Sequence, residues 1–143
     1  MALPEPRLGL VISYSYLWRR ESERGREEGR KDRPCVIILS VEHSEAERIV
    51  TVVPVTHSHP ADSRLAIELP LRVKLHLGLD DQPSWVMLDE GNRFLWPGYD
   101  LRPIKEDNSR FDYGFLPPRL FLELVQRFVA IWTAGQGKTI KRD

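Results

Sequence analysis

Apolar side chains alternate with small or polar ones near the start of the chain, and this pattern predicts a strand. One face carries Leu8, Leu10, Ile12, Tyr14 and Tyr16, and the other carries Gly9, Val11, Ser13 and Ser15. Because alternate residues of a strand point to opposite faces, the segment predicts a half-buried strand. Residues 34–41 and 49–55 are almost continuously apolar and predict buried strands, joined by the polar turn 43–47.

The rest of the chain predicts short elements and one long helix. In order, these are a strand over 64–69, a helix over 70–77 stopped by Gly78, a strand over 84–88, a turn over 89–92 and a Pro- and Gly-rich segment over 96–118. After Pro117 and Pro118, the apolar residues Leu120, Leu124, Phe128 and Ile131 follow helical spacing. The pattern predicts a mainly β (α+β) fold, a small antiparallel barrel with a C-terminal helix on one flank. We expect one domain over 1–134 and a flexible tail over 135–143.

The composition restricts the kinds of partner and the cellular compartment that we expect for the protein. The chain has 21 Lys and Arg and 21 Asp and Glu, so binding to nucleic acid has to come from local basic patches. The one cysteine, Cys35, lies in an apolar strand and is expected to be a buried, inert thiol in a reducing compartment. No apolar run reaches membrane-spanning length, and residues 1–6 lack the features of a signal peptide. We therefore expect a cytoplasmic protein without a membrane partner.

A charged segment over 19–33 separates the first two strands. It consists almost entirely of charged residues and glycine, has no apolar face, and is expected to be a mobile surface loop with at most a transient helical turn. Most segments of this kind are only solvated surface. This one ends in the basic cluster Arg30, Lys31 and Arg33, which is suited to guiding a phosphate backbone.

Two strand ends carry the candidate chemistry. Arg33 precedes the buried strand that starts at Pro34, and Thr56, His57 and His59 follow the strand over 49–55. If these strands pair, the cation, the hydroxyl and the imidazoles meet at one rim of the sheet. Such a combination is suited to a phosphodiester, because the cation stabilises anionic oxygens and an imidazole transfers protons at neutral pH.

Other residues have simpler interpretations beside functional ones. His57 and His59 have the spacing of a metal pair, but no third ligand lies at ligand spacing, so we expect no metal and favour a solvated loop or proton transfer. Trp85 and Trp132 follow apolar periodicity and are expected in the core, whereas Trp18 and Trp96 border loops. Trp18 is a candidate for stacking on a base. Asp89 ends a strand in a turn, where aspartate is common for local hydrogen bonding.

Taken together, these segments resemble the PemK/MazF family of toxins from toxin–antitoxin pairs. The resemblance covers residues 8–132. It rests on the opening strand Gly9–Ile12, the loop containing Gly29, the Arg33-Pro34 junction, the Val53-Pro54-Val55-Thr56 segment, the Ser84–Asp89 strand and the C-terminal helix.

This resemblance implies an SH3-like barrel that forms a homodimer and is inhibited by a cognate antitoxin protein. It implies metal-independent cleavage of single-stranded RNA, with no cofactor. Arg33 matches the active-site arginine of the family and Thr56 its active-site threonine, while Asp89 matches an aspartate implicated in some members. With His57 added for proton transfer, these residues form the expected catalytic set, and Arg30, Lys31, His59 and Trp18 form the expected RNA-binding set.

The sequence also departs from the family pattern. Met87 stands where some members have an arginine, His57-Ser58-His59-Pro60 replaces the more usual residues after the threonine, and the segment over 96–118 is longer than in compact members. Two alternatives to a ribonuclease therefore stay open. One is a non-catalytic barrel that binds an antitoxin-like peptide or another protein, and the other is a gyrase-directed toxin of the same fold.

Overall fold

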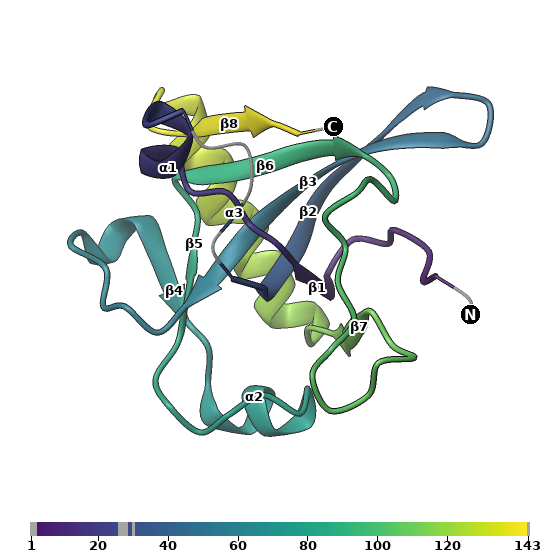
Figure 1. Cartoon of the computed structure of the whole chain (residues 1–143). Coiled ribbons are helices and arrows are strands. Elements are labelled where there is room, and N and C mark those ends of the chain that lie inside the picture. Colours follow the sequence, from purple (N-terminus) through teal and green to yellow (C-terminus); the bar gives the residue numbers. More distant parts are fainter. Residues whose placement is uncertain (1–2, 26–28, 30, 143) are drawn as a thin grey trace.

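The computed structural model describes residues 3–25, 29 and 31–142. Its elements are β1 (Leu10–Tyr14), α1 (Arg19–Glu23), β2 (Arg33–Ser44), β3 (Glu47–Thr56), a 3₁₀ turn η1 (Ser63–Leu65), β4 (Ala66–Glu68), α2 (Leu71–His76), β5 (Trp85–Met87), β6 (Glu90–Leu95), β7 (Asp112–Phe115), α3 (Pro118–Thr133) and β8 (Lys138–Lys141). They form a mostly antiparallel sheet that curls into a half-barrel, with α3 packed along one side (Figure 1). The sequence-based prediction of the fold class is therefore confirmed.

The long strands β2 and β3 organise the sheet. The strand order is β4-β5-β3-β2-β1-β7, and β6 pairs with both β3 and β8. Along the edge opposite β2, strand β3 pairs with two strands: Ile49–Val52 pair with β6, and Val55 and Thr56 pair with β5. This division lets the sheet curl around β3. Only β6 and β8 run parallel among the pairs of the described strands.

Both faces are buried over residues 35–38 of β2 and 50–56 of β3. On one face, Val36, Ile38 and Val53 pack against α3 through Leu124 and Phe128. On the other face, inside the curl, a second cluster contains Leu10, Ile12, Tyr14, Ile37, Val52 and Phe94. Strand β1 was expected to be half-buried, and that prediction is wrong, since all of its residues are buried. The reason is that Val11 reaches the α3 side while Leu10 and Ile12 line the curl.

Four expectations about local structure differ from the observed structure. The charged segment starts with α1 instead of a loop, and residues expected to be a turn or irregular form β6 and β7. The segment expected to be a flexible tail contains β8, which pairs with β6, and its last described residue, Arg142, is buried. Arg142 donates to Ser15 O at 3.0 Å and to Asn92 Oδ1 at 2.8 Å, and these bonds hold the tail.

Close packing explains two glycines. A Cβ on Gly29 would lie 2.2 Å from the carbonyl oxygen of Tyr16, so only glycine lets the charged loop return this close to the end of β1. A Cβ on Gly137 would lie 2.2 Å from the ring of Trp132, so glycine lets the chain pass over α3 into β8. Cys35 is fully buried, as expected, and burial raises the pKa of its thiol. In the described part of the chain, no helix is long and apolar enough to cross a membrane.

Candidate active site

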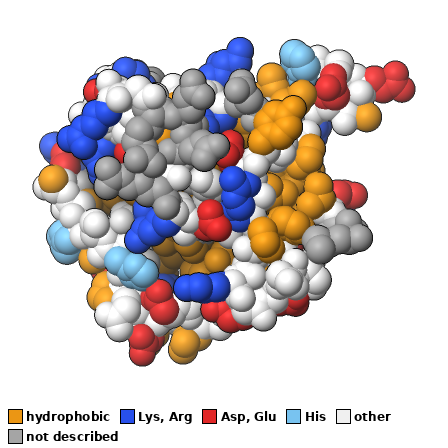
Figure 2. Space-filling view, in the orientation of Figure 1, with side chains coloured by type: hydrophobic (Ala, Val, Ile, Leu, Met, Phe, Trp, Pro, Cys, Tyr) orange, Lys and Arg blue, Asp and Glu red, His pale blue; other side chains and the backbone are white. Residues whose placement is uncertain are grey.

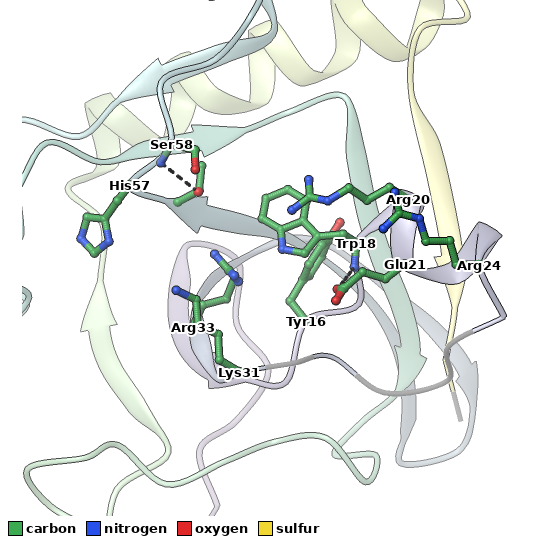
Figure 3. A pocket seen from close by; sticks show the side chains of 10 residues that line it. Tyr16, Trp18, Arg20, Glu21, Arg24, Lys31, Arg33, His57 and Ser58 are labelled. Atoms are coloured by element: carbon green, nitrogen blue, oxygen red, sulfur yellow. Dashed lines mark hydrogen bonds between the residues drawn. The ribbon is translucent and has the colours of Figure 1, made fainter.

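A cavity of about 330 Å³ opens where β2 begins and β3 ends. Cys35 lies opposite Pro54 in the strand pair, so Arg33 and Thr56 come to the same end of the sheet. Helix α1 closes the other side. The lining residues are Tyr16, Trp18, Arg20, Glu21, Arg24, Lys31, Arg33, Thr56, His57 and Ser58. Figure 3 shows these side chains around the cavity, and Figure 2 shows several Lys and Arg side chains around a hollow on one face of the molecule.

Arg33 is partly buried at the wall of this cavity. Its Nη1 donates to the carbonyl oxygen of Val55 at 3.4 Å, a long hydrogen bond. Its Nε is buried and has no hydrogen-bond partner among the described residues. Burial lowers the pKa of Arg33, yet a guanidinium stays charged at physiological pH. Arg33 is therefore a partly desolvated cation at the wall of a cavity.

Trp18 supports two of the cations. The guanidinium carbons of Arg20 and Arg33 lie 5.0 Å and 4.9 Å from the centroid of its ring, within the range of cation–π interactions. Tyr16 packs edge-on against the same ring, with centroids 5.2 Å apart. Trp18 as a whole residue is only 8% exposed. Its ring thus contacts two arginines, and stacking of Trp18 on a base stays a prediction.

Thr56 and His57 form the facing wall. Thr56 is 8% exposed, and its Oγ1 accepts a hydrogen bond from the Ser58 backbone at 3.1 Å, which fixes the hydroxyl at the end of β3. The next residue, His57, is exposed and is held through Nε2, which lies 2.8 Å from Asp80 Oδ2. Arg33, Thr56 and His57 thus line one cavity, together with the exposed Lys31.

A buried lysine anchors Asp80 next to this wall. Lys74 of α2 is 2% exposed, and its ammonium donates to Asp80 Oδ1 at 2.8 Å, to Ser84 Oγ at 2.7 Å and to the carbonyl oxygen of Gln82. The hydrogen bond from Lys74 is the main reason why the pKa of Asp80 lies below its usual range. A smaller cavity of about 120 Å³ lies between this group and Arg33, Thr56 and His57.

Two of the expected site residues, His59 and Asp89, do not join this group. His59 turns away, with Nδ1 3.0 Å from Pro60 O and its ring 4.9 Å from that of Trp85. Asp89 lines neither cavity; its Oδ1 is buried without a partner among the described residues, and burial raises the pKa of its carboxyl group. Arg30 lies outside the described residues.

The diverging rings of His57 and His59 do not form a metal pair. Within the residues that the structure describes, no group of three or more His, Cys, Asp or Glu side chains is arranged to hold a metal ion.

Several lining residues were missed from the sequence. Arg20, Glu21 and Arg24 belong to α1 or its end, and the only local signal was a glutamate at the third position after Trp18. Glu21 Oε1 accepts a hydrogen bond from the Trp18 backbone at 3.2 Å, a contact typical of a helix start. The signal for Lys74 was its place beside the apolar positions Val73 and Leu77 on a short helix.

The comparisons with known proteins identify the family. A model of PemK-like, MazF-like toxins of type II toxin–antitoxin systems matches residues 16–93, more than half of the chain. The chain belongs to this family. Neither the curated proteins nor the solved structures give a match. Arg33, Thr56 and Asp89 all lie inside the matched region of this PemK-like chain, and membership of a toxin–antitoxin family implies an antitoxin partner.

Proposed function

We propose that this chain is the toxin of a toxin–antitoxin pair and that it cleaves single-stranded RNA without a metal ion or other cofactor. The observation that carries the proposal is the convergence of Arg33, Thr56 and His57 on one cavity whose wall also bears Arg20, Arg24 and Lys31. Four cations line the cavity against one carboxylate, Glu21, and such an excess of positive charge concentrates anionic substrates. RNA is the polyanion whose own hydroxyl can act as the nucleophile.

The basic side chains that line the cavity bind the phosphate backbone of the RNA. The guanidinium of Arg33, which lines the cavity, offers paired donors to the oxygens of one phosphate. Arg20, Arg24 and Lys31 contact the adjoining phosphates. Arg30 precedes Lys31 and is included from the sequence alone. The proposed substrate is single-stranded, as the family resemblance implies, and the cations that line the cavity are suited to its backbone.

The proposed reaction is an internal transfer. The 2′-oxygen bonds to the adjacent phosphorus as its proton leaves, the bond from phosphorus to the 5′-oxygen breaks, and the 5′-oxygen takes up a proton. The products end in a 2′,3′-cyclic phosphate and a 5′-hydroxyl. Arg33 stabilises the charge that grows on the phosphate oxygens, Thr56 holds one of these oxygens, and His57 transfers a proton. We leave Asp89 out of this set, because it lines neither cavity.

A homodimer is also part of the proposal. Val41 on β2, Ile49 on β3 and Leu95 on β6 lie side by side across the sheet. Val41 is 60% exposed and Leu95 is 39% exposed, so this row offers apolar surface to a second copy. A cytoplasmic location agrees with an RNA substrate and with Cys35, a lone buried thiol.

The experiment that tests the proposal is incubation of the purified protein with single-stranded RNA in EDTA. We expect fragments with cyclic phosphate ends. A protein that binds RNA without cutting it, or that leaves RNA untouched, would support the alternative of a binding module or a different toxin target.

A further inference from the structure

His57 is the end of a chain of hydrogen bonds that leads into the protein. Its Nε2 lies 2.8 Å from Asp80 Oδ2. Asp80 Oδ1 accepts from Lys74 Nζ at 2.8 Å and from the Gln82 backbone at 3.0 Å. One carboxylate oxygen is thus held by the scaffold, and the other is directed at the imidazole.

The lysine makes this anchor rigid. Lys74 is 2% exposed, and its ammonium group donates to Asp80, Ser84 and Gln82. A buried ammonium is costly unless its donors are used, so the loop over 80–84 is held around it. The pKa of Asp80 is lowered mainly by the hydrogen bond from Lys74, which keeps the carboxylate ionised at neutral pH.

An ionised carboxylate can only accept hydrogen bonds, so Nε2 of His57 must be the nitrogen that carries the proton. Nδ1 of the neutral ring is then left without a proton and can accept one. In a solvated histidine the two nitrogens share this role, and the ring turns freely.

We infer that Asp80, anchored by Lys74, is a positioning residue that fixes the ring and tautomer of His57 so that Nδ1 removes the proton of the RNA 2′-hydroxyl. This inference rests on the proposed ribonuclease function. The proton passes from the 2′-oxygen to Nδ1 as the 2′-oxygen bonds to phosphorus, the bond to the 5′-oxygen breaks, and the 5′-oxygen takes a proton from water. The resulting imidazolium is paired with the Asp80 carboxylate and returns its proton to solvent.

Other charged side chains line the two cavities together with His57 and contribute to the electrostatic potential there. From the elements that line the two cavities with it, these are Arg20, Glu21, Arg24, Lys31, Asp32, Arg33, Lys74 and Asp80. Of these groups, Asp80 is the one in hydrogen-bond contact with the ring of His57.

The variant Asp80→Asn separates position from charge. Its amide keeps an oxygen for Lys74 and the Gln82 backbone, but presents NH₂ to His57. That group donates to Nε2, which moves the ring proton to Nδ1 and blocks the proposed base. We expect kcat for RNA cleavage to fall at least about tenfold with KM nearly unchanged, since a positioned proton-transfer group contributes about a hundredfold or more.

Asp81→Asn is the matched control. Asp81 is the exposed neighbour, and its carboxylate accepts from Gln82 Nε2 at 3.2 Å without touching His57. This variant makes the same chemical change one residue away and should cleave at the wild-type rate. Melting temperatures of both variants show whether either change affects the fold.

Two further measurements distinguish positioning from a structural role. In a His57→Ala background, Asp80→Asn should cause no further loss, because Asp80 acts through the imidazole. Ring nitrogen spectra should show the Nε2–H tautomer in the wild type and the Nδ1–H tautomer in Asp80→Asn. His43 and His76, whose rings have no hydrogen-bond partner among the described residues, give the solution reference in the same spectra.

The outcomes are separable. If the wild type cleaves and Asp80→Asn cleaves equally well, or loses the same factor with and without His57, the inference is overturned while the proposed function stands. If Asp80→Asn fails to fold, a wild-type His57 with the same tautomer ratio as His43 and His76 overturns it, and a higher Nε2–H fraction supports it. A wild type that does not cleave RNA removes the proposed function and the inference together.

Discussion

Replacement of Arg33 by alanine is the perturbation that bears most directly on the proposed site. In the folded protein, Arg33 Nε is a buried donor without a partner among the described residues, and its guanidinium lies over Trp18. A phosphate that gains negative charge in the transition state would accept hydrogen bonds from the guanidinium of Arg33, which lines the cavity. Loss of one such preorganised donor costs about 3 kcal/mol, which corresponds to a rate reduction of about a hundredfold.

The same change should affect stability only slightly. The variant loses one cation–π contact, worth about 1 kcal/mol, and a hydrogen bond to Val55 that is long at 3.4 Å. It also no longer buries a charge, since burial lowers the pKa of Arg33. We therefore expect a melting temperature within about 4 °C of the wild type. Arg33→Lys should recover part of the rate, because an ammonium lacks the planar paired donors.

Arg48→Ala is the matched control for this experiment. Arg48 also lies partly buried on the β2–β3 pair, at the other end of β3, and donates to the backbone oxygen of Ser40 at 3.2 Å. Cleavage rates should be compared on one fluorescent RNA at saturating concentration. We expect Arg48→Ala to cleave at the wild-type rate. A folded Arg33→Ala protein that is equally fast would refute the assignment of the site.

Further predictions concern binding, stability and assembly. RNA affinity should fall with salt at a log–log slope of about −0.7 for each phosphate neutralised, and Arg24→Gln should make the slope shallower by about that amount; a slope near zero would show that the cations do not contact phosphates. Burial raises the pKa of Asp89, so the folded state binds this proton more tightly than the unfolded state does. The free energy of unfolding of the protein should therefore fall as the pH rises from the unfolded-state pKa of Asp89 through its folded-state pKa. Asp89→Asn should therefore raise the melting temperature at pH 7 and remove that part of the pH dependence, whereas an unchanged melting curve would contradict it. Sedimentation at micromolar concentration should give twice the chain mass of 16.6 kDa, and Val41→Glu should give the monomer; a wild-type monomer would rule out the dimer.

Local patterns in the sequence were sufficient to predict the central strands and the last helix. The β-branched runs of β2 and β3 and the helical spacing of Leu124 and Phe128 are repeated over many residues. Strand β6 has no such pattern, because its buried Asn92 is stabilised by the backbone of Leu17 and by Arg142 instead of by apolar packing. Those partners are distant in the sequence, so neither β6 nor its neighbour β8 could be recognised from local periodicity.

The candidate site, too, could be predicted from the sequence only in part. Arg33 and Thr56 were predicted to meet because they flank two strands that a short turn joins, and the pairing of Cys35 with Pro54 fixes that end of the sheet. The link from Lys74 to His57 could not be predicted, because a lysine on a short helix is normally exposed. Its burial depends on acceptors supplied by the loop over 80–84, which become visible only in three dimensions.

The chemical groups at the ends of the RNA fragments show whether the protein cleaves RNA without a metal ion and through the 2′-hydroxyl. Purified protein is incubated with a defined single-stranded RNA in excess EDTA, and the fragments are analysed by mass. We expect cleavage in the presence of the chelator, with a 2′,3′-cyclic phosphate on one fragment and a 5′-hydroxyl on the other. Intact RNA under these conditions, or fragments with a 5′-phosphate, would contradict metal-independent cleavage by the 2′-hydroxyl.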